Sequence, residues 1–279
     1  MSLQLASYLD AVRAKTPLVH NITNYVTVND CANILLACGG SPIMADDADE
    51  VEDITSICGG LNINLGTLNR NTIPSMFLAG RRANALGHPV ILDPVGAGAS
   101  DLRTATAKKL LAEIRFACIR GNISEIKTLA VGSGATRGVD ADVADAVTEE
   151  TLGSVVAFAR RFAAETGAVV AITGATDLVA DADRAYLIRN GHPRMAGITG
   201  SGCMLTAMTA AYLVANPADP LGAVVASIAA MGLCGERAAE KTEAAGEGNA
   251  SFRNHLIDEV SLLTGEALAA GAKVTEYGC

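Results

Sequence analysis

A Gly-rich run directly before a long apolar stretch is the strongest chemical signal in the sequence. Residues 196–206 read AGITGSGCMLT, so Gly200 and Gly202 adjoin a predicted helix over residues 202–215. The N–H groups of residues 200–203 can form an anion-binding cup, because a helix begins with unpaired donors and a positive dipole end. Cys203 falls in that first turn, where we expect the dipole to lower the pKa of the thiol. The alternative is a turn that lets the helix pack closely beside a buried, inert cysteine.

An aspartate ends a buried apolar run in VILDPVGAG, residues 90–98. Pro94 and two glycines follow Asp93 and predict an abrupt turn. A carboxylate at this place faces the sheet edge where α/β proteins bind ligands. The alternative is an aspartate that only caps the loop.

The run IRGNISE, residues 119–125, places polar groups after the next predicted strand. Asn122 can cap a helix that carries Glu125 three residues later, which is the pattern of a capping box. The functional alternative is that Asp93 and Glu125 hold a hydrated Mg²⁺ while Arg120 contacts phosphate. Mg²⁺ favours such a sparse set, because it keeps waters and binds substrate phosphates.

Two further runs carry polar groups whose roles the sequence leaves open. Thr173 follows the apolar run VVAI, and its hydroxyl can donate to a phosphate oxygen or to a turn carbonyl. Near the N-terminus, PLVHNITN places His20, Asn21 and Asn24 among apolar residues. These three side chains either cap groups in the core or contact a small polar heterocycle.

The elements that position these residues alternate along the chain. We predict strands over residues 41–44, 61–65, 89–94, 117–120, 169–173, 177–180 and 185–189. We predict helices near residues 3–14, 25–38, 48–58, 71–86, 101–115, 123–130, 149–166, 202–215, 220–240 and 251–270.

Strand-then-helix order over residues 40–175 predicts parallel strands joined by right-handed crossovers. Their continuous apolar runs predict a sheet covered on both faces. The strands over residues 177–180 and 185–189 predict a hairpin at the sheet edge, and the last 80 residues read as nearly all helix. We therefore expect one α/β domain over residues 1–279, with a mostly parallel central sheet and helices on both faces.

Composition excludes several classes of partner. The chain has 279 residues, 50% of them apolar, and a net charge of −9 without a basic run, so nucleic acid and acidic membranes are not expected partners. The uncharged stretches at 199–218 and 220–235 do not read as membrane spans, since the first contains Asn216 and Pro217 and the second is short. Seven cysteines without a C-x-x-C pair predict reduced thiols in a soluble, cytoplasmic protein. P-loop and G-x-G-x-x-G motifs are absent from the sequence.

The order of the motifs resembles the hydroxyethylthiazole kinase family of the ribokinase-like superfamily over nearly the whole chain. The segments that carry the resemblance are PLVHNITNYV with ANILLACGGSPIM, NINLGTL, PVILDPVGAGA, IRGNISEI, VVAITG and GITGSGC. Other ribokinase-like enzymes usually carry Asp where this chain has Cys203, and a cysteine there is typical of the thiazole kinases. Residues 132–147 match the family loosely, and we expect a surface loop there.

The resemblance implies transfer of the ATP γ-phosphoryl group to the primary alcohol of 4-methyl-5-(2-hydroxyethyl)thiazole, with Mg²⁺, in thiamine biosynthesis or salvage. It also implies a homotrimer whose thiazole pocket is shared between subunits. The residues it implies are Cys203, Gly200 and Gly202 for the transfer, Asn24, Met44, Gly66 and Gly200 for the thiazole, Arg120, Thr173 and Asn122 for ATP, and Asp93 and Glu125 for Mg²⁺.

Four rival functions remain to be distinguished. A hydroxymethylpyrimidine kinase would act on another alcohol, and an ATP-dependent dehydratase would release phosphate without a stable phosphorylated product. A nucleotide-binding regulator would bind ATP without alcohol-dependent turnover. A nicotinamide-dependent oxidoreductase is disfavoured by the absent dinucleotide motif.

Overall fold

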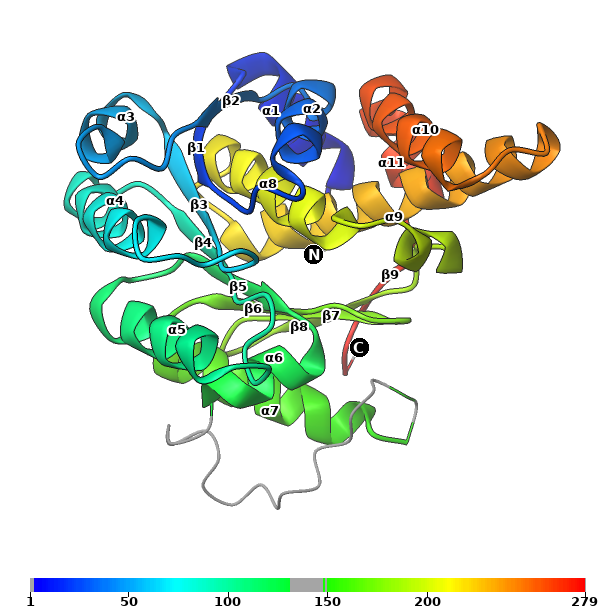
Figure 1. Cartoon of the computed structure of the whole chain (residues 1–279). Helices are drawn as coiled ribbons and strands as arrows, with labels where there is room; N and C mark the ends of the chain where they lie inside the picture. Colours follow the sequence, from blue (N-terminus) through cyan, green and yellow to red (C-terminus); the bar gives the residue numbers. More distant parts are fainter. Residues whose placement is uncertain (1–2, 131–147, 149, 279) are drawn as a thin grey trace.

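The computed structural model describes residues 3–130, 148 and 150–278, whose strands form one nine-stranded sheet in the order β2-β1-β3-β4-β5-β6-β7-β8-β9 (Figure 1). Strands β1 to β6 are parallel, as the alternating pattern predicted, and β7 to β9 are antiparallel. The strands are β1 (Leu18–Ile22), β2 (Ser41–Met44), β3 (Gly60–Asn64), β4 (Val90–Asp93), β5 (Cys118–Gly121), β6 (Val169–Ile172), β7 (Asp177–Ala180), β8 (Ala185–Ile188) and β9 (Val274–Glu276). The surface loop expected over residues 132–147 lies outside the described residues.

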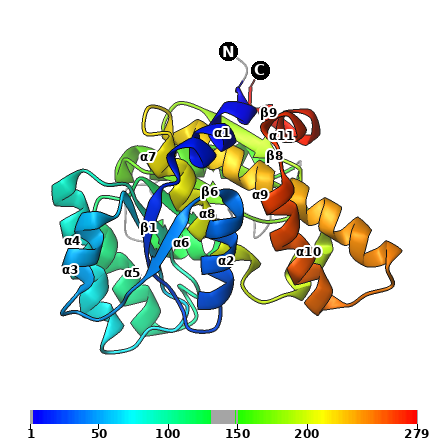
Figure 2. The same cartoon turned by 90° about the horizontal axis from the view of Figure 1, so that it is seen from above.

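Helices cover both faces of the sheet (Figures 1 and 2). One face is covered by α1 (Leu5–Lys15), α2 (Val28–Cys38), α8 (Ser201–Ala215), α9 (Pro220–Ala244), α10 (Asn249–Leu262) and α11 (Gly265–Gly271). The other face is covered by α3 (Val51–Ile57), α4 (Thr72–Leu86), α5 (Asp101–Glu113), α6 (Ile123–Ala130) and α7 (Leu152–Thr166). The predicted α/β class is therefore confirmed.

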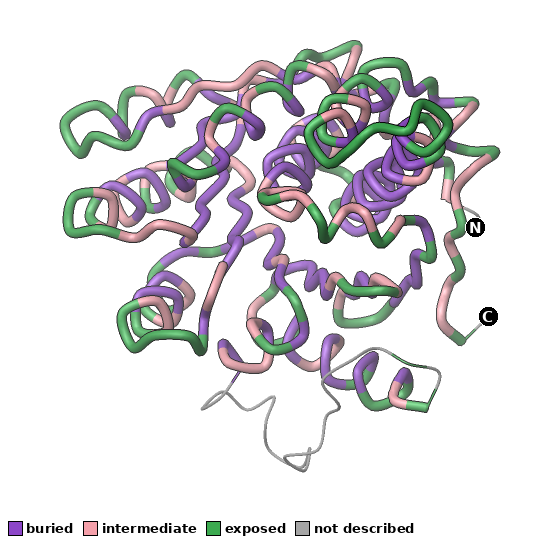
Figure 3. Tube along the Cα trace, turned by 45° about the vertical axis from the view of Figure 1, so that its right-hand side comes forward, coloured by how far each residue is buried: buried purple, intermediate pink, exposed green. Residues whose placement is uncertain are grey.

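The core is divided by the sheet into two apolar layers, seen as the buried centre of Figure 3. Strand residues alternate between the layers: Val19 and Ile91 face α8 and its neighbours, whereas Ile22 and Ile63 face α3 to α7. Helix α9 is long and apolar enough to cross a membrane, but 89% of its most apolar window is buried inside the protein. It is apolar because it packs in the core.

Strand β1 is one of the elements that the sequence pattern did not indicate, because two polar residues interrupt its apolar run. His20 is fully buried, and its Nε2 donates to the carbonyl oxygen of Ala45 at 2.9 Å while its Nδ1 accepts from Thr55 Oγ1 at 2.9 Å. Burial lowers the pKa of His20, which favours this neutral ring. On the opposite face, Asn21 Oδ1 accepts from Asn62 Nδ2 at 3.0 Å. Hydrogen bonds to residues distant in sequence thus satisfy the His20 and Asn21 side chains, whose polarity hid the strand pattern.

The C-terminal region differs from the prediction in three respects. The helix expected over residues 251–270 is two helices, because Leu263 is extended and Thr264 caps α11 by accepting from the Ala267 N–H at 3.1 Å. The last residues are not all helical, since β9 pairs with β8. The predicted hairpin of β7 and β8 forms, but β9 covers its outer strand, so the hairpin is not the sheet edge. A three-residue strand has too short a pattern to be recognised in sequence.

Candidate active site

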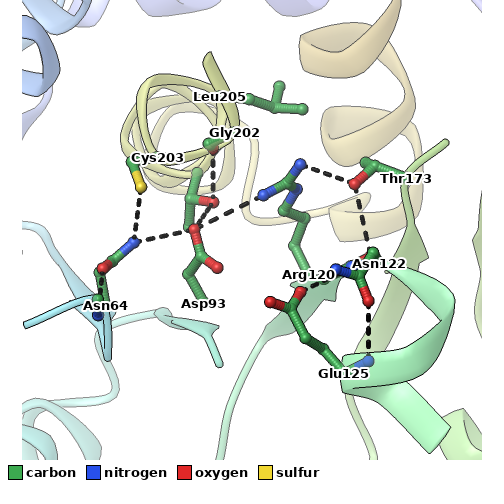
Figure 4. Close-up of polar contacts among 12 residues, drawn as sticks. Asn64, Asp93, Arg120, Asn122, Glu125, Thr173, Gly202, Cys203 and Leu205 are labelled. Atoms are coloured by element: carbon green, nitrogen blue, oxygen red, sulfur yellow. Dashed lines mark hydrogen bonds and ion pairs between the residues drawn. The ribbon is translucent and has the colours of Figure 1, made fainter. Parts of the chain in front are cut away.

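Four neighbouring strands bring polar side chains to one edge of the sheet, opposite the start of α8 (Figure 4). Asn64 ends β3 and Asp93 ends β4, while Arg120 lies near the end of β5 and Thr173 directly follows β6. Parallel strands place their carboxyl ends together, so residues distant in sequence converge here. The structure brings Asp93, Arg120 and Thr173 into one cluster, as the sequence predicted.

The Gly-rich turn adopts the conformation that its glycines permit. Gly200 has φ +84° and immediately precedes α8, which begins at Ser201. A side chain on Gly200 would overlap Thr27 Cγ2, and one on Gly202 would lie 2.7 Å from Arg120 Nη1. The backbone of α8 at Gly202 can therefore approach Arg120 closely.

Cys203 lies half-buried in the first turn of α8, with two amides directed at its sulfur. Asn24 Nδ2 and Asn64 Nδ2 each donate to Cys203 Sγ at 3.3 Å. Burial, followed by the charge of Asp93, raises the pKa of the Cys203 thiol despite these hydrogen bonds. The expectation that the helix end lowers this pKa is therefore wrong, because desolvation and a nearby carboxylate oppose the dipole. The raised pKa favours the neutral thiol.

Asp93 is fully buried and only one of its oxygens is satisfied. Its Oδ2 accepts from Thr206 Oγ1 at 2.8 Å and from Asn64 Nδ2 at 3.0 Å, and lies 3.6 Å from Arg120 Nη1. Its Oδ1 has no hydrogen-bond partner. Burial raises the pKa of Asp93 to about 6, although Arg120 and the two hydrogen bonds lower it.

Arg120 contacts both Asp93 and Thr173 and so connects the ends of β4 and β6. Its Nη2 donates to Thr173 Oγ1 at 2.7 Å, and its Nη1 faces Asp93. Its Nε is buried without a partner. The guanidinium thus lies between the start of α8 and the end of β6, where it can meet an anion from either side.

Asn122 and Glu125 form the capping box that their spacing indicated. The Glu125 N–H donates to Asn122 Oδ1 at 2.9 Å, and the Asn122 N–H donates to Glu125 Oε2 at 2.9 Å. Glu125 Oε1 also accepts from the Gly96 N–H at 2.8 Å, which ties α6 to the loop after β4. The charge of Glu125 is one of the causes that raise the pKa of Asp93.

The chemistry of these two carboxylates fits a hydrated magnesium ion. The unpaired Asp93 Oδ1 is an available oxygen ligand, and a cation would relieve the repulsion between Asp93 and Glu125. Within the described part of the chain, no three His, Cys, Asp or Glu side chains cluster as a metal site. A cation here would therefore depend on waters and phosphates for its other ligands, as Mg²⁺ commonly does.

The residues predicted for the thiazole pocket fall into two groups. Asn24 and Gly66 meet at Asn64 Oδ1, which accepts from Asn24 Nδ2 at 3.0 Å and from the Gly66 N–H at 2.8 Å. Gly200 adjoins them through Thr27, whose hydroxyl donates to Asn24 Oδ1 at 3.0 Å. Met44, by contrast, ends the edge strand β2, two strand spacings or roughly 10 Å from β3, and lies outside this hydrogen-bonded group.

A cavity of about 540 Å³ opens on the other side of Arg120 and Gly202. It lies between the ends of β6 to β8 and the helices α8 and α9, and its volume is within the range of small-molecule sites. Its polar lining includes Arg120, Thr173, Asp177, Asn190, His192 and Ser201. Its apolar wall includes Leu205, Ile228 and Met231.

Sequence reasoning did not assign four of the polar residues found here. Asn64, Thr27 and Thr206 bind the predicted residues to one another, and Asp177 lines the cavity, where burial raises its pKa to about 6. Asn64 could have been found from the alternation of Asn62 and Asn64 in an apolar strand. Thr206 could have been found from its place three residues after Cys203, on the same helix face.

Comparison with known proteins assigns the fold and then the family. The solved structure of a ribokinase-like superfamily protein from Enterococcus faecalis matches with a TM-score of 0.61 and 11% sequence identity, over 92% of this chain and 95% of that chain. The fold is therefore that of the ribokinase-like class. A family model, the hydroxyethylthiazole kinase family, matches residues 9–266, and the chain belongs to that family.

Relatives of the chain agree with this assignment along its whole length. The hydroxyethylthiazole kinase of Clostridium acetobutylicum is 62% identical over 273 residues, which are 98% of this chain and 100% of that protein. The solved structure of a hydroxyethylthiazole kinase protein from Pyrococcus horikoshii matches with a TM-score of 0.86 and 34% identity, covering 98% of each chain. The resemblance seen in the motifs is confirmed, and the chain is a kinase.

Proposed function

We propose that this chain transfers the γ-phosphoryl group of ATP to the primary hydroxyl of 4-methyl-5-(2-hydroxyethyl)thiazole, for thiamine biosynthesis or salvage. The family of the chain supports the reaction. The observation that carries the residue roles is the position of Arg120 and Gly202, which separate the cavity from the group around Cys203. We assign ATP to the cavity and the thiazole alcohol to the side of Cys203.

The ATP phosphates are assigned to the part of the cavity nearest α8. Arg120 and Thr173 line this part of the cavity. Because they are hydrogen-bonded to each other, both lie at one place where they can donate to a phosphate oxygen. Asn122 supports them by starting α6 directly after β5. The N–H groups that follow Gly200 stabilise charge on the transferred group, because they are unpaired donors at a positive helix end.

Asp93 and Glu125 are the residues that would hold Mg²⁺. The unpaired Asp93 Oδ1 and the mutual repulsion of the two carboxylates support this assignment. When bound, Mg²⁺ supplies positive charge that neutralises the phosphate oxygens during transfer. Arg120 lies 3.6 Å from Asp93 and adds a second, fixed positive charge at the same edge.

Cys203 is assigned to the side of the acceptor hydroxyl. Phosphoryl transfer depends on positioning and charge neutralisation more than on a strong base, so a neutral thiol is compatible with it. Asn24 and Asn64 donate to Cys203 Sγ and fix the sulfur at the start of α8. The hydroxyl oxygen bonds to phosphorus as the bond from phosphorus to the bridging oxygen of ADP breaks, ADP leaves, and the hydroxyl proton passes to water.

We also propose that the enzyme is a cytoplasmic homotrimer with the thiazole pocket shared between subunits. Next to Asn24, the apolar side chains of Tyr25 and Val26 are 77% and 55% exposed, and Leu36 on α2 is 59% exposed. The exposure of Tyr25 and Val26 beside Asn24, and of Leu36 farther along α2, supports a subunit contact on this part of the surface. The six described cysteines are free thiols, which supports a reducing compartment.

The test is ADP release from ATP and Mg²⁺ with and without the hydroxyethylthiazole, with mass spectrometry of the product. We expect thiazole-dependent ADP release and a product heavier by one phosphate. Hydroxymethylpyrimidine serves as the control alcohol, and phosphate release without a phosphorylated product would indicate a dehydratase instead. ATP binding without turnover of any alcohol would refute the kinase assignment.

A further inference from the structure

Arg103 lies half-buried in the first turn of α5 and reaches back to two loops of the site. Its Nη1 donates to the carbonyl oxygen of Val95 at 2.8 Å, and its Nη2 donates to the carbonyl oxygen of Gly66 at 2.5 Å. Among the described residues, no carboxylate lies within ion-pair distance of its guanidinium. The Arg103 guanidinium therefore donates its hydrogen bonds to backbone carbonyls of two different loops.

The loop after β4 is shaped around this guanidinium. Gly96 has φ +73°, and a side chain there would lie 2.7 Å from Arg103 Nη1. The Gly96 N–H donates to Glu125 Oε1 at 2.8 Å. Arg103 and Glu125 thus hold the carbonyl and the N–H of one peptide group, the Val95–Gly96 peptide, in the loop that directly follows Asp93.

The loop after β3 is held at both peptide groups of Gly66. The Gly66 N–H donates to Asn64 Oδ1, and the Gly66 carbonyl accepts from Arg103. Asn64 also donates to Cys203 Sγ and to Asp93 Oδ2. A displacement of Gly66 would therefore be transmitted to the group around Cys203.

We propose that Arg103 is a positioning residue that fixes the acceptor-side loop at Gly66 relative to the loop at Val95 and Gly96. This rests on the proposed function, in which the acceptor alcohol lies on the side of Cys203, to which Asn64 joins the first loop, and Asp93, which directly precedes the second loop, holds the metal. The planar fork of arginine can donate to two carbonyls at once from one rigid group, whereas the single ammonium of lysine cannot hold both in the same geometry. Misplacement by about 1 Å between reacting groups lowers a rate by about a hundredfold.

The test compares Arg103→Lys and Arg103→Gln with Arg81→Gln, in which an exposed arginine of α4 loses its ion pair to Glu113. We expect kcat to fall about tenfold to a hundredfold in both Arg103 variants and KM for the thiazole to rise, with KM for ATP changed less than about twofold. A third variant, Arg103→Ala, removes the whole side chain, and added guanidinium ion should restore part of its kcat by occupying the same position. The Arg81 variant should match the wild type in all three constants.

Amide hydrogen exchange provides a readout that does not need turnover. Loss of the two Arg103 hydrogen bonds should speed amide exchange by about tenfold or more in segments 65–68 and 94–99 together, because local opening governs exchange. Arg81→Gln should leave exchange in both segments unchanged. Wild-type kcat and thiazole KM in both Arg103→Lys and Arg103→Gln would overturn the proposal, as would a lowered melting temperature with unchanged kinetics and exchange. If the wild-type enzyme shows no thiazole-dependent turnover, the proposed function fails, while the exchange data still decide whether Arg103 joins the two loops.

Discussion

Replacing Asp93 by asparagine should remove activity yet make the protein more stable at neutral pH. Asp93 is fully buried, and burial raises its pKa from 3.8 to about 6 even with Arg120 nearby. Folding therefore favours the protonated carboxyl. The stability that this group contributes is complete below about pH 4 and is lost as the pH rises through about 6.

The size of the effect follows from the two pKa values. A rise from 3.8 to about 6 corresponds to about 3 kcal/mol of unfolding free energy lost on ionisation. Attraction to Arg120 is already included, because it contributes to the pKa of the folded state. The neutral amide in Asp93→Asn resembles the protonated carboxyl, so we expect this variant to gain roughly 1–3 kcal/mol at about pH 7.5 and little at about pH 4.

Urea unfolding at about pH 4 and about pH 7.5, without nucleotide or Mg²⁺, measures this difference. Asp53→Asn, on the exposed face of α3, is the matched control, because it removes one carboxylate of equal charge from the surface. Turnover of the thiazole is measured in parallel and should be lost only in Asp93→Asn. If that variant is less stable than the wild type, and more so at the higher pH than at the lower, the Asp93 charge stabilises the fold through Arg120 and the reasoning is wrong.

Substitutions at three further positions test individual roles in the site. Glu125→Gln should raise the Mg²⁺ concentration needed for half-maximal activity, and an unchanged Mg²⁺ titration would leave Glu125 as only a helix cap and loop tie. Cys203→Ala should retain measurable turnover and Cys203→Asp should retain or increase it, whereas loss of all turnover in both folded variants would give the thiol another role. Gly200→Ala should cost about 2 kcal/mol or more of unfolding free energy and reduce turnover, because the new side chain meets Thr27 at φ +84°; calorimetry showing unchanged stability would contradict this.

Several parts of the fold could be predicted from local pattern because their causes are local. The parallel strands β2 to β6 are short apolar runs bounded by turn residues, and burial of β3 to β6 on both faces favours that composition. The capping box of Asn122 and Glu125 depends only on a three-residue spacing. Strand β1 could not be predicted in the same way, since His20 and Asn21 are acceptable in a buried strand only through Thr55 and Asn62.

The groups that end the strands and start α8 can be read from the amino-acid sequence, and the order of its motifs indicates the family. How these groups affect one another depends on the packing of distant segments. Asn24 and Cys203 are separated by 179 residues, Asn64 and Cys203 by 139, and Asp93 and Thr206 by 113. The direction of the Cys203 pKa shift depends on this assembly, because desolvation and the Asp93 charge exist only once the sheet and α8 have packed together.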